Sequence, residues 1–196
     1  MNKTSLEAFS DGVFAIIITI MVLELKIPKG TSWEVVKVLL PTLYCYALSF
    51  VFVAIYWNNH HHLMHTAKSV TAGMMWANMG LLFCLSLVPF ATGWMGENCF
   101  DRITVATYGA LLIACGLAFT ILSSTIQRTH TEDTPMTKAL RKTMPKQYAS
   151  VVLYSLSIPM ALFVSPLIAE LLFVTVAVLW IIPSKEIERA LKEPRP

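Results

Sequence analysis

The chain has 196 residues, of which 56% are hydrophobic and 14% charged, with a formal net charge of +3 and a mean hydropathy of +0.62. Soluble domains carry about one quarter charged residues, so this composition excludes an ordinary soluble domain and predicts an integral membrane protein. Apolar runs recur along the whole length. We therefore expect residues 1–196 to form a single transmembrane domain.

The first apolar run, over residues 6–25, carries Ser10 and Asp11 near its start. Its charge-free part has 12 residues, which span about 18 Å as a helix, against a hydrocarbon core of about 30 Å. A carboxylate at this place is costly unless it faces protein or water. We expect this helix to lie inside a bundle and to line a water-filled path.

Five further apolar runs predict helices over residues 33–57, 70–94, 103–126, 147–164 and 167–183. The last two divide a 36-residue apolar stretch that is too long for one span; we expect a hinge at Ser165 and Pro166, with Pro159 kinking the first of them. One long polar stretch, residues 127–146, precedes them. The predicted fold class is all-α, with six transmembrane helices.

The distribution of Lys and Arg predicts the orientation. If the N-terminus is cytoplasmic, the cytoplasmic segments hold eleven of these residues and the opposite segments hold four. This bias agrees with the positive-inside rule only for an even number of spans. We expect a multi-pass protein of the plasma membrane with both termini in the cytoplasm.

One face of the first helix combines Gly12, Ile16, Thr19 and Leu23, with Ile20 beside them. Ordinary apolar packing explains this spacing. The alternative is that several copies of the face surround an axis. The three apolar side chains would then form rings that close by dewetting, and Thr19 would supply hydroxyls to replace the hydration shell of an ion.

The second helix ends in YWNNHHHLMH, which contains His60, His61, His62 and His65. Pairs of histidines three or four residues apart suit metal binding. The sequence offers no convincing third ligand and no HExxH motif, so we expect neither a metal site nor any other cofactor.

Hydrogen bonding between helices is the role we expect for these imidazoles. The start of the first helix and the end of the second lie on the same side of the membrane, so Ser10 and Asp11 can meet His60 or His61. Asn78, in the third helix, is expected to make an interhelical hydrogen bond as well.

Enzyme motifs are missing from the sequence. It has no G-x-S-x-G elbow and no phosphate-binding glycine loop, so we expect no enzyme, and no nucleic-acid partner is expected. It also lacks a TVGYG-type filter. Two other functions stay open: a proton-coupled secondary transporter that uses Asp11 and the histidines as a relay, and a metal or haem protein built on the histidines.

Three segments resemble the transmembrane-protein-175 potassium channel family. The first-helix motif of that family, R-x-x-x-F-S-D, is similar to LEAFSDGVFAIIITIMVLELKIP in this chain. Its W-x-x-H-H segment is similar to YWNNHHHLM, and its third helix, with the pattern W-x-N…P-F, is similar to MMWANMGLLFCLSLVPF. The resemblance implies a six-helix subunit. It also implies that bacterial-type members form homotetramers in the lipid bilayer, where four copies of helix 1 surround a path for K⁺, with other monovalent cations as further candidates.

The same resemblance implies roles for single residues. The constriction is an isoleucine five residues after the motif Asp, here Ile16, and further pore positions match Thr19, Ile20 and Leu23. It assigns the remaining matched positions to an interhelical network: Phe9, Ser10, Asp11, Trp57, His60 and His61.

One position departs from the family motif. The motif Arg, four residues before Phe9, is Ser5 in this chain. Lys3 is two residues away and would substitute only in part, because a lysine lacks the planar fork of an arginine.

Overall fold

The structure is a computed structural model that describes residues 2–67, 69–128 and 135–181, with side chains from residue 143 onward in the last range. The described residues form helices joined by loops, which confirms the all-α prediction. The α-helices are α1 (Lys3–Leu23), α2 (Trp33–Thr66), α3 (Ala72–Ser86), α4 (Val88–Glu97), α5 (Arg102–Gln127), α6 (Pro135–Pro159) and α7 (Pro166–Ile181), and a π-helix, η1 (Met160–Val164), follows α6.

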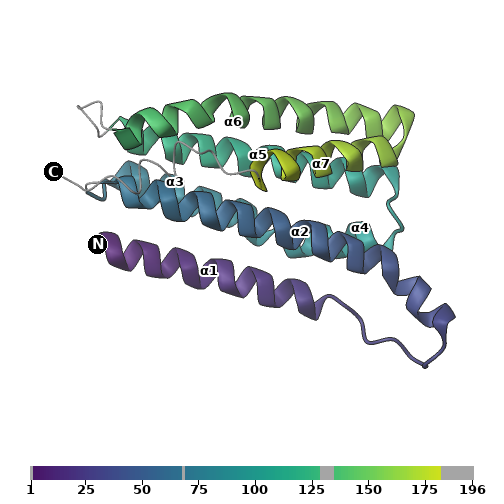
Figure 1. The fold of residues 1–196 in the computed structure, drawn as a ribbon. Coiled ribbons are helices and arrows are strands. Elements are labelled where there is room, and N and C mark those ends of the chain that lie inside the picture. The colour runs from purple at the N-terminus through teal and green to yellow at the C-terminus, as the bar shows by residue number, and fades with distance from the viewer. Residues whose placement is uncertain (1, 68, 129–134, 182–196) are drawn as a thin grey trace.

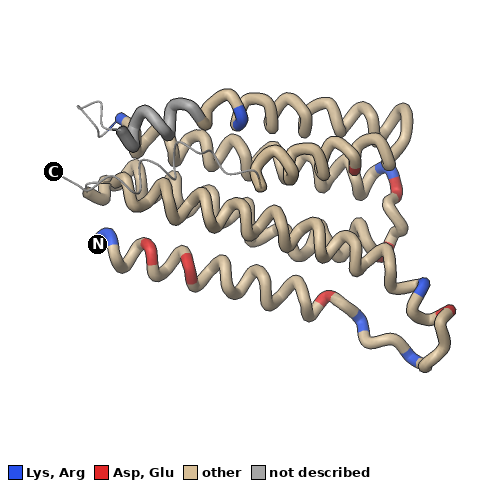
Figure 2. Tube along the Cα trace, viewed as in Figure 1, with Lys and Arg blue, Asp and Glu red and all other residues tan. Residues whose placement is uncertain are grey.

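The helices form a bundle in which successive segments run in opposite directions, α3 and α4 together making one passage (Figure 1). Among the described residues, five segments are long and apolar enough to cross a membrane: α1, α2, 72–97, α5 and 143–164. The shorter apolar helix α7 has 16 residues and spans about 24 Å. Charged residues gather toward the two ends of the bundle (Figure 2). The chain is therefore a multi-pass membrane protein.

The predicted hinge between the last two helices is confirmed. Ser165 is extended, with φ −158° and ψ 132°, and α7 starts at the next residue, Pro166. The Ser165 N–H donates to the carbonyl of Met160 at 2.7 Å, five residues back, as in a π-helix. Pro159, at the junction of α6 and η1, has no N–H for the regular ladder, which favours this irregular turn.

Three helices differ in their bounds from the predicted spans. Helix α2 continues past 57 to Thr66 and includes the segment YWNNHHHLMH, because its polar residues do not break a helix. The third predicted helix is divided at Leu87, since Pro89 opens a new helix, α4. Helix α6 starts at Pro135 instead of 147. The last two residues of the predicted span 167–183 lie outside the described residues.

Close backbone contacts and hydrogen bonds between buried hydroxyl groups hold α2, α4 and α5 together. A Cβ on Gly96 of α4 would lie 2.8 Å from the Cα of Thr42, so only glycine permits this approach to α2. The buried Ser49 hydroxyl pairs with the Tyr108 hydroxyl at 2.8 Å and accepts from Thr92 at 2.7 Å. These bonds join α2, α4 and α5 and satisfy polar groups that have no access to water.

Candidate functional site

Helix α1 has two different faces, and they explain how it sits on the bundle. The buried stripe, Leu6, Ser10, Phe14, Ile17 and Met21, packs against the other helices. The opposite face leaves Ile16 57%, Ile20 42% and Leu23 78% exposed, and Gly12 and Thr19 are exposed as well. The side chains that the sequence predicts as pore-lining thus lie on a face of α1 that is exposed in this chain.

Thr19 is the hydroxyl-bearing side chain of that face. Its Oγ1 donates to the carbonyl of Ile16 at 2.9 Å, so its proton is used inside the helix. The oxygen of this exposed side chain can still accept a hydrogen bond.

A buried polar chain ties α1 to α3 and α2. The Asn78 amide donates to Ser10 Oγ at 2.9 Å, and Ser10 itself donates to the carbonyl of Leu6 at 2.8 Å. His60 Nε2 lies 2.7 Å from Asn78 Oδ1. Because that oxygen only accepts, His60 carries its proton on Nε2. All three side chains are buried, so these hydrogen bonds satisfy polar groups that have no access to water.

Asp11 has a separate partner. Its Oδ1 accepts from Trp57 Nε1 at 2.9 Å, and the Trp57 indole stacks on His61 with ring centroids 5.9 Å apart. The predicted direct contacts of Ser10 and Asp11 with His60 or His61 are thus replaced by contacts through Asn78 and Trp57. Asn78 stands between Ser10 and His60, and Trp57 stands between Asp11 and His61.

Lys3 does not serve as the partner of Asp11. Its ammonium donates to the carbonyl of His65 at 3.1 Å and lies 3.9 Å from Glu7. Ser5 and Phe9 line one side of an open apolar hollow of about 360 Å³, whose other walls are Met75, Trp76 and Met79 on α3. Asp11 is thus held by a neutral indole N–H and not by the cation that the family motif would supply.

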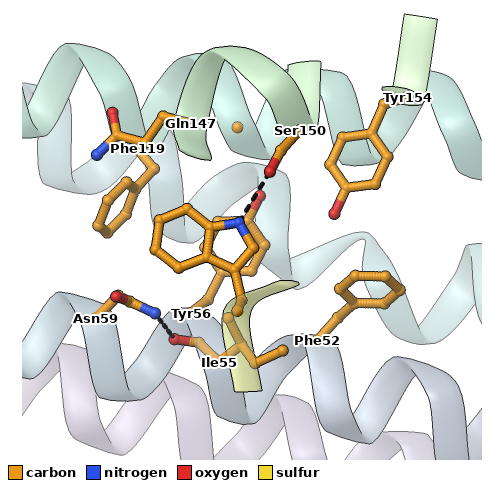
Figure 3. Close-up of a pocket in the computed structure, with 10 residues that line it drawn as sticks. Phe52, Ile55, Tyr56, Asn59, Phe119, Gln147, Ser150 and Tyr154 are labelled. Atoms are coloured by element: carbon orange, nitrogen blue, oxygen red, sulfur yellow. Dashed lines mark hydrogen bonds between the residues drawn. The ribbon is translucent and has the colours of Figure 1, made fainter. Parts of the chain in front are cut away.

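Two features were missed by the sequence reasoning. A cavity of about 40 Å³ lies between α2, α5, α6 and α7, and Figure 3 draws the residues that line it. There Trp180 Nε1 donates to Ser150 Oγ at 2.8 Å. The other is Glu170 of α7, which is only 7% exposed. The sequence could have indicated Glu170, because a carboxylate inside the apolar stretch 147–182 is unusual. It could not have indicated the cavity, because residues from four separate helices line it.

The histidines at the end of α2 are partly engaged. His60 is buried in the chain described above, whereas His61 and His65 are exposed with their Nε2 atoms 3.1 Å apart. Over the part of the chain that the structure describes, no three His, Cys, Asp or Glu side chains group as metal ligands. A conventional three-ligand zinc site is not built there.

Comparisons with known proteins agree with this architecture. The family model described as "Endosomal/lysosomal potassium channel TMEM175" matches residues 5–89. A potassium channel of Chryseobacterium sp. (strain P1-3) is 49% identical over 193 residues, which are 98% of this chain and 100% of that protein. A potassium channel of Streptomyces collinus is 33% identical over 138 residues, covering 66% of this chain and 67% of that one.

A solved structure extends the likeness to the fold. The crystal structure of a lysosomal potassium-selective channel TMEM175 homolog from Chamaesiphon minutus has a TM-score of 0.76, with 22% identity, over 92% of this chain and 96% of that one. The first three helices carry the family match, and nearly the whole chain aligns with a relative almost half identical to it. The chain is a member of the TMEM175 family.

Proposed function

We propose that this chain forms a K⁺-permeable channel in which copies of α1 surround a central path. The observation that carries the proposal is the exposed face of α1, apolar at Ile16, Ile20 and Leu23 and hydroxyl-bearing at Thr19. One helix cannot enclose a path, so several subunits are needed, and a homotetramer supplies four copies. The names of its relatives as potassium channels support K⁺ as the permeant ion.

In this proposal Ile16 forms the narrowest ring and closes the path by dewetting. Thr19, one turn further, presents its oxygen to the ion, and no resident cofactor takes part. Both termini lie in the cytoplasm, in agreement with the distribution of Lys and Arg, and the plasma membrane is the site of action. The buried chain from Ser10 to His60 holds α1 in position while its other face stays free.

The contacts around Asp11 favour a channel over a proton-coupled transporter. A proton relay needs an unbroken chain of exchangeable groups between Asp11 and the histidines. Asp11 is bonded to an indole N–H, which does not exchange a proton in this way, and His60 is bonded to an amide.

Flux through the purified full-length chain tests the proposed function. Reconstituted in liposomes, it should pass K⁺ down a gradient without saturation and without a proton gradient. Native mass spectrometry in detergent should give four chains per particle. A single chain per particle, or saturable uptake that requires a proton gradient, would contradict the proposal.

Replacing Thr19 with valine should reduce the preference for K⁺ over Na⁺. Valine keeps the shape and removes only the hydroxyl, which is worth about 1 kcal/mol, so we expect the permeability ratio to fall by up to about fivefold. Reversal potentials under mixed-ion conditions measure the ratio. Thr19→Ser is the matched control and should keep it. An unchanged ratio in the valine variant would remove the hydroxyl from the path.

A further inference from the structure

We propose that His61 and His65 form an open binding site for a transition-metal ion such as Zn²⁺. Both side chains are exposed at the end of α2, one helical turn apart. Their Nε2 atoms converge to 3.1 Å, and the two rings meet at 83° with centroids 4.5 Å apart. The remaining coordination positions would be filled by water.

The separation of the two nitrogens fits a shared metal ion. Zinc binds imidazole nitrogen at about 2.0 to 2.1 Å. Two such bonds at an angle of about 100 to 110° place the nitrogens about 3.1 to 3.4 Å apart. The observed distance lies within this interval. The two nitrogens are therefore already at the separation that a shared ion requires, and each ring has to turn its Nε2 toward that ion.

The surroundings hold one ligand in place and leave the site accessible. Trp57 stacks on His61 at an interplanar angle of 28°, and the indole is fixed in turn by its hydrogen bond to Asp11. In the metal-free pair one Nε2–H donates to the other Nε2. Binding requires that ring to carry its proton on Nδ1 instead, which is a change of neutral tautomer with no net release of protons.

The neighbouring histidines are poorer ligands. His60 is buried and bonded to Asn78. His62 is partly buried, with its ring centroid 6.0 Å from that of His61.

The chemistry of the pair also selects the class of ion. Imidazole suits Zn²⁺, Cu²⁺ and Ni²⁺, whereas Mg²⁺ and Ca²⁺ prefer carboxylates and other oxygens. Within the described ranges no third side chain of the usual ligand types joins the pair. Lys3 donates to the His65 carbonyl at 3.1 Å, and Glu7 partly offsets its charge at 3.9 Å. We expect a reversible site and not a structural one.

Calorimetry on the full chain, purified without an affinity tag, tests the site. Titration with Zn²⁺ should show saturable binding of one ion per chain, and Mg²⁺ should show none. The Cu²⁺-loaded protein should give an electron paramagnetic resonance spectrum with splitting from two nitrogens. Absence of saturable Zn²⁺ binding would overturn the proposal.

Two variants identify the ligands. His65→Gln keeps a polar side chain of similar length and should abolish the saturable binding and the two-nitrogen signal. His62→Ala is the matched control and should retain both. Loss of binding in His62→Ala together with retention in His65→Gln would also overturn the proposal. Thermal unfolding of each variant establishes that it is folded.

Discussion

Replacing Ile16 with asparagine is expected to raise K⁺ flux and to weaken the preference for K⁺ over Na⁺. The ring of apolar side chains excludes water from the narrowest point, and an ion pays part of its hydration energy to pass it. An amide that supplies about 1 kcal/mol of hydrogen bonding there would raise the rate about fivefold. The same polar contact serves Na⁺, so discrimination falls. Liposome flux and reversal potentials measure the two effects.

The control for this variant lies on the same helix. Val22 is six residues from Ile16, about 120° around the helix axis, and is 46% exposed. Val22→Asn introduces the same amide away from the proposed path and should leave flux and selectivity unchanged. Equal effects of the two variants, or no effect of Ile16→Asn, would exclude Ile16 as the constriction.

Much of the fold could be predicted because hydrophobic runs and prolines act locally. The hinge at Ser165 follows from the length of the apolar stretch and from the two prolines that bound η1. Pro89 likewise indicates the division of the third helix at Leu87, but the apolar run has the length of a single span, which favours one unbroken helix. Helix α2 extends past the predicted span end at 57, because Asn and His do not favour the hydrocarbon core but do not break a helix either.

The sequence could predict which residues belong to the candidate site, but not which of them contact one another. Spacing identified which side chains of α1 share a face, and their exposure agrees with that grouping. The partners across helices were beyond the sequence, because they depend on how α1, α2 and α3 are rotated against one another. That rotation places Asn78, and not an imidazole, against Ser10. For the same reason, the convergence of the two Nε2 atoms at the end of α2 could not be read from i, i+4 spacing alone.

The buried hydrogen bond between Asn78 and His60 gives the second large effect that we expect. Replacing Asn78 with leucine keeps the volume but leaves the His60 N–H buried without an acceptor, whereas Ser10 keeps its bond to the Leu6 carbonyl. The unfolding free energy should fall by about 1 to 3 kcal/mol. Thermal unfolding in detergent measures the loss. Asn98→Ala, at an exposed amide bonded within its own turn, should change stability by less than about 0.5 kcal/mol.

A double-mutant cycle separates the hydrogen bond from packing. His60→Leu alone leaves Asn78 Oδ1 without its donor, but His60→Leu with Asn78→Leu removes both polar partners at once. Because replacing both partners is far less costly than orphaning one, the double variant should be more stable than the sum of the single effects predicts, by about 1 kcal/mol. Simple additivity would mean that the two side chains act independently, and that apolar packing instead of this hydrogen bond holds α2 against α3 here.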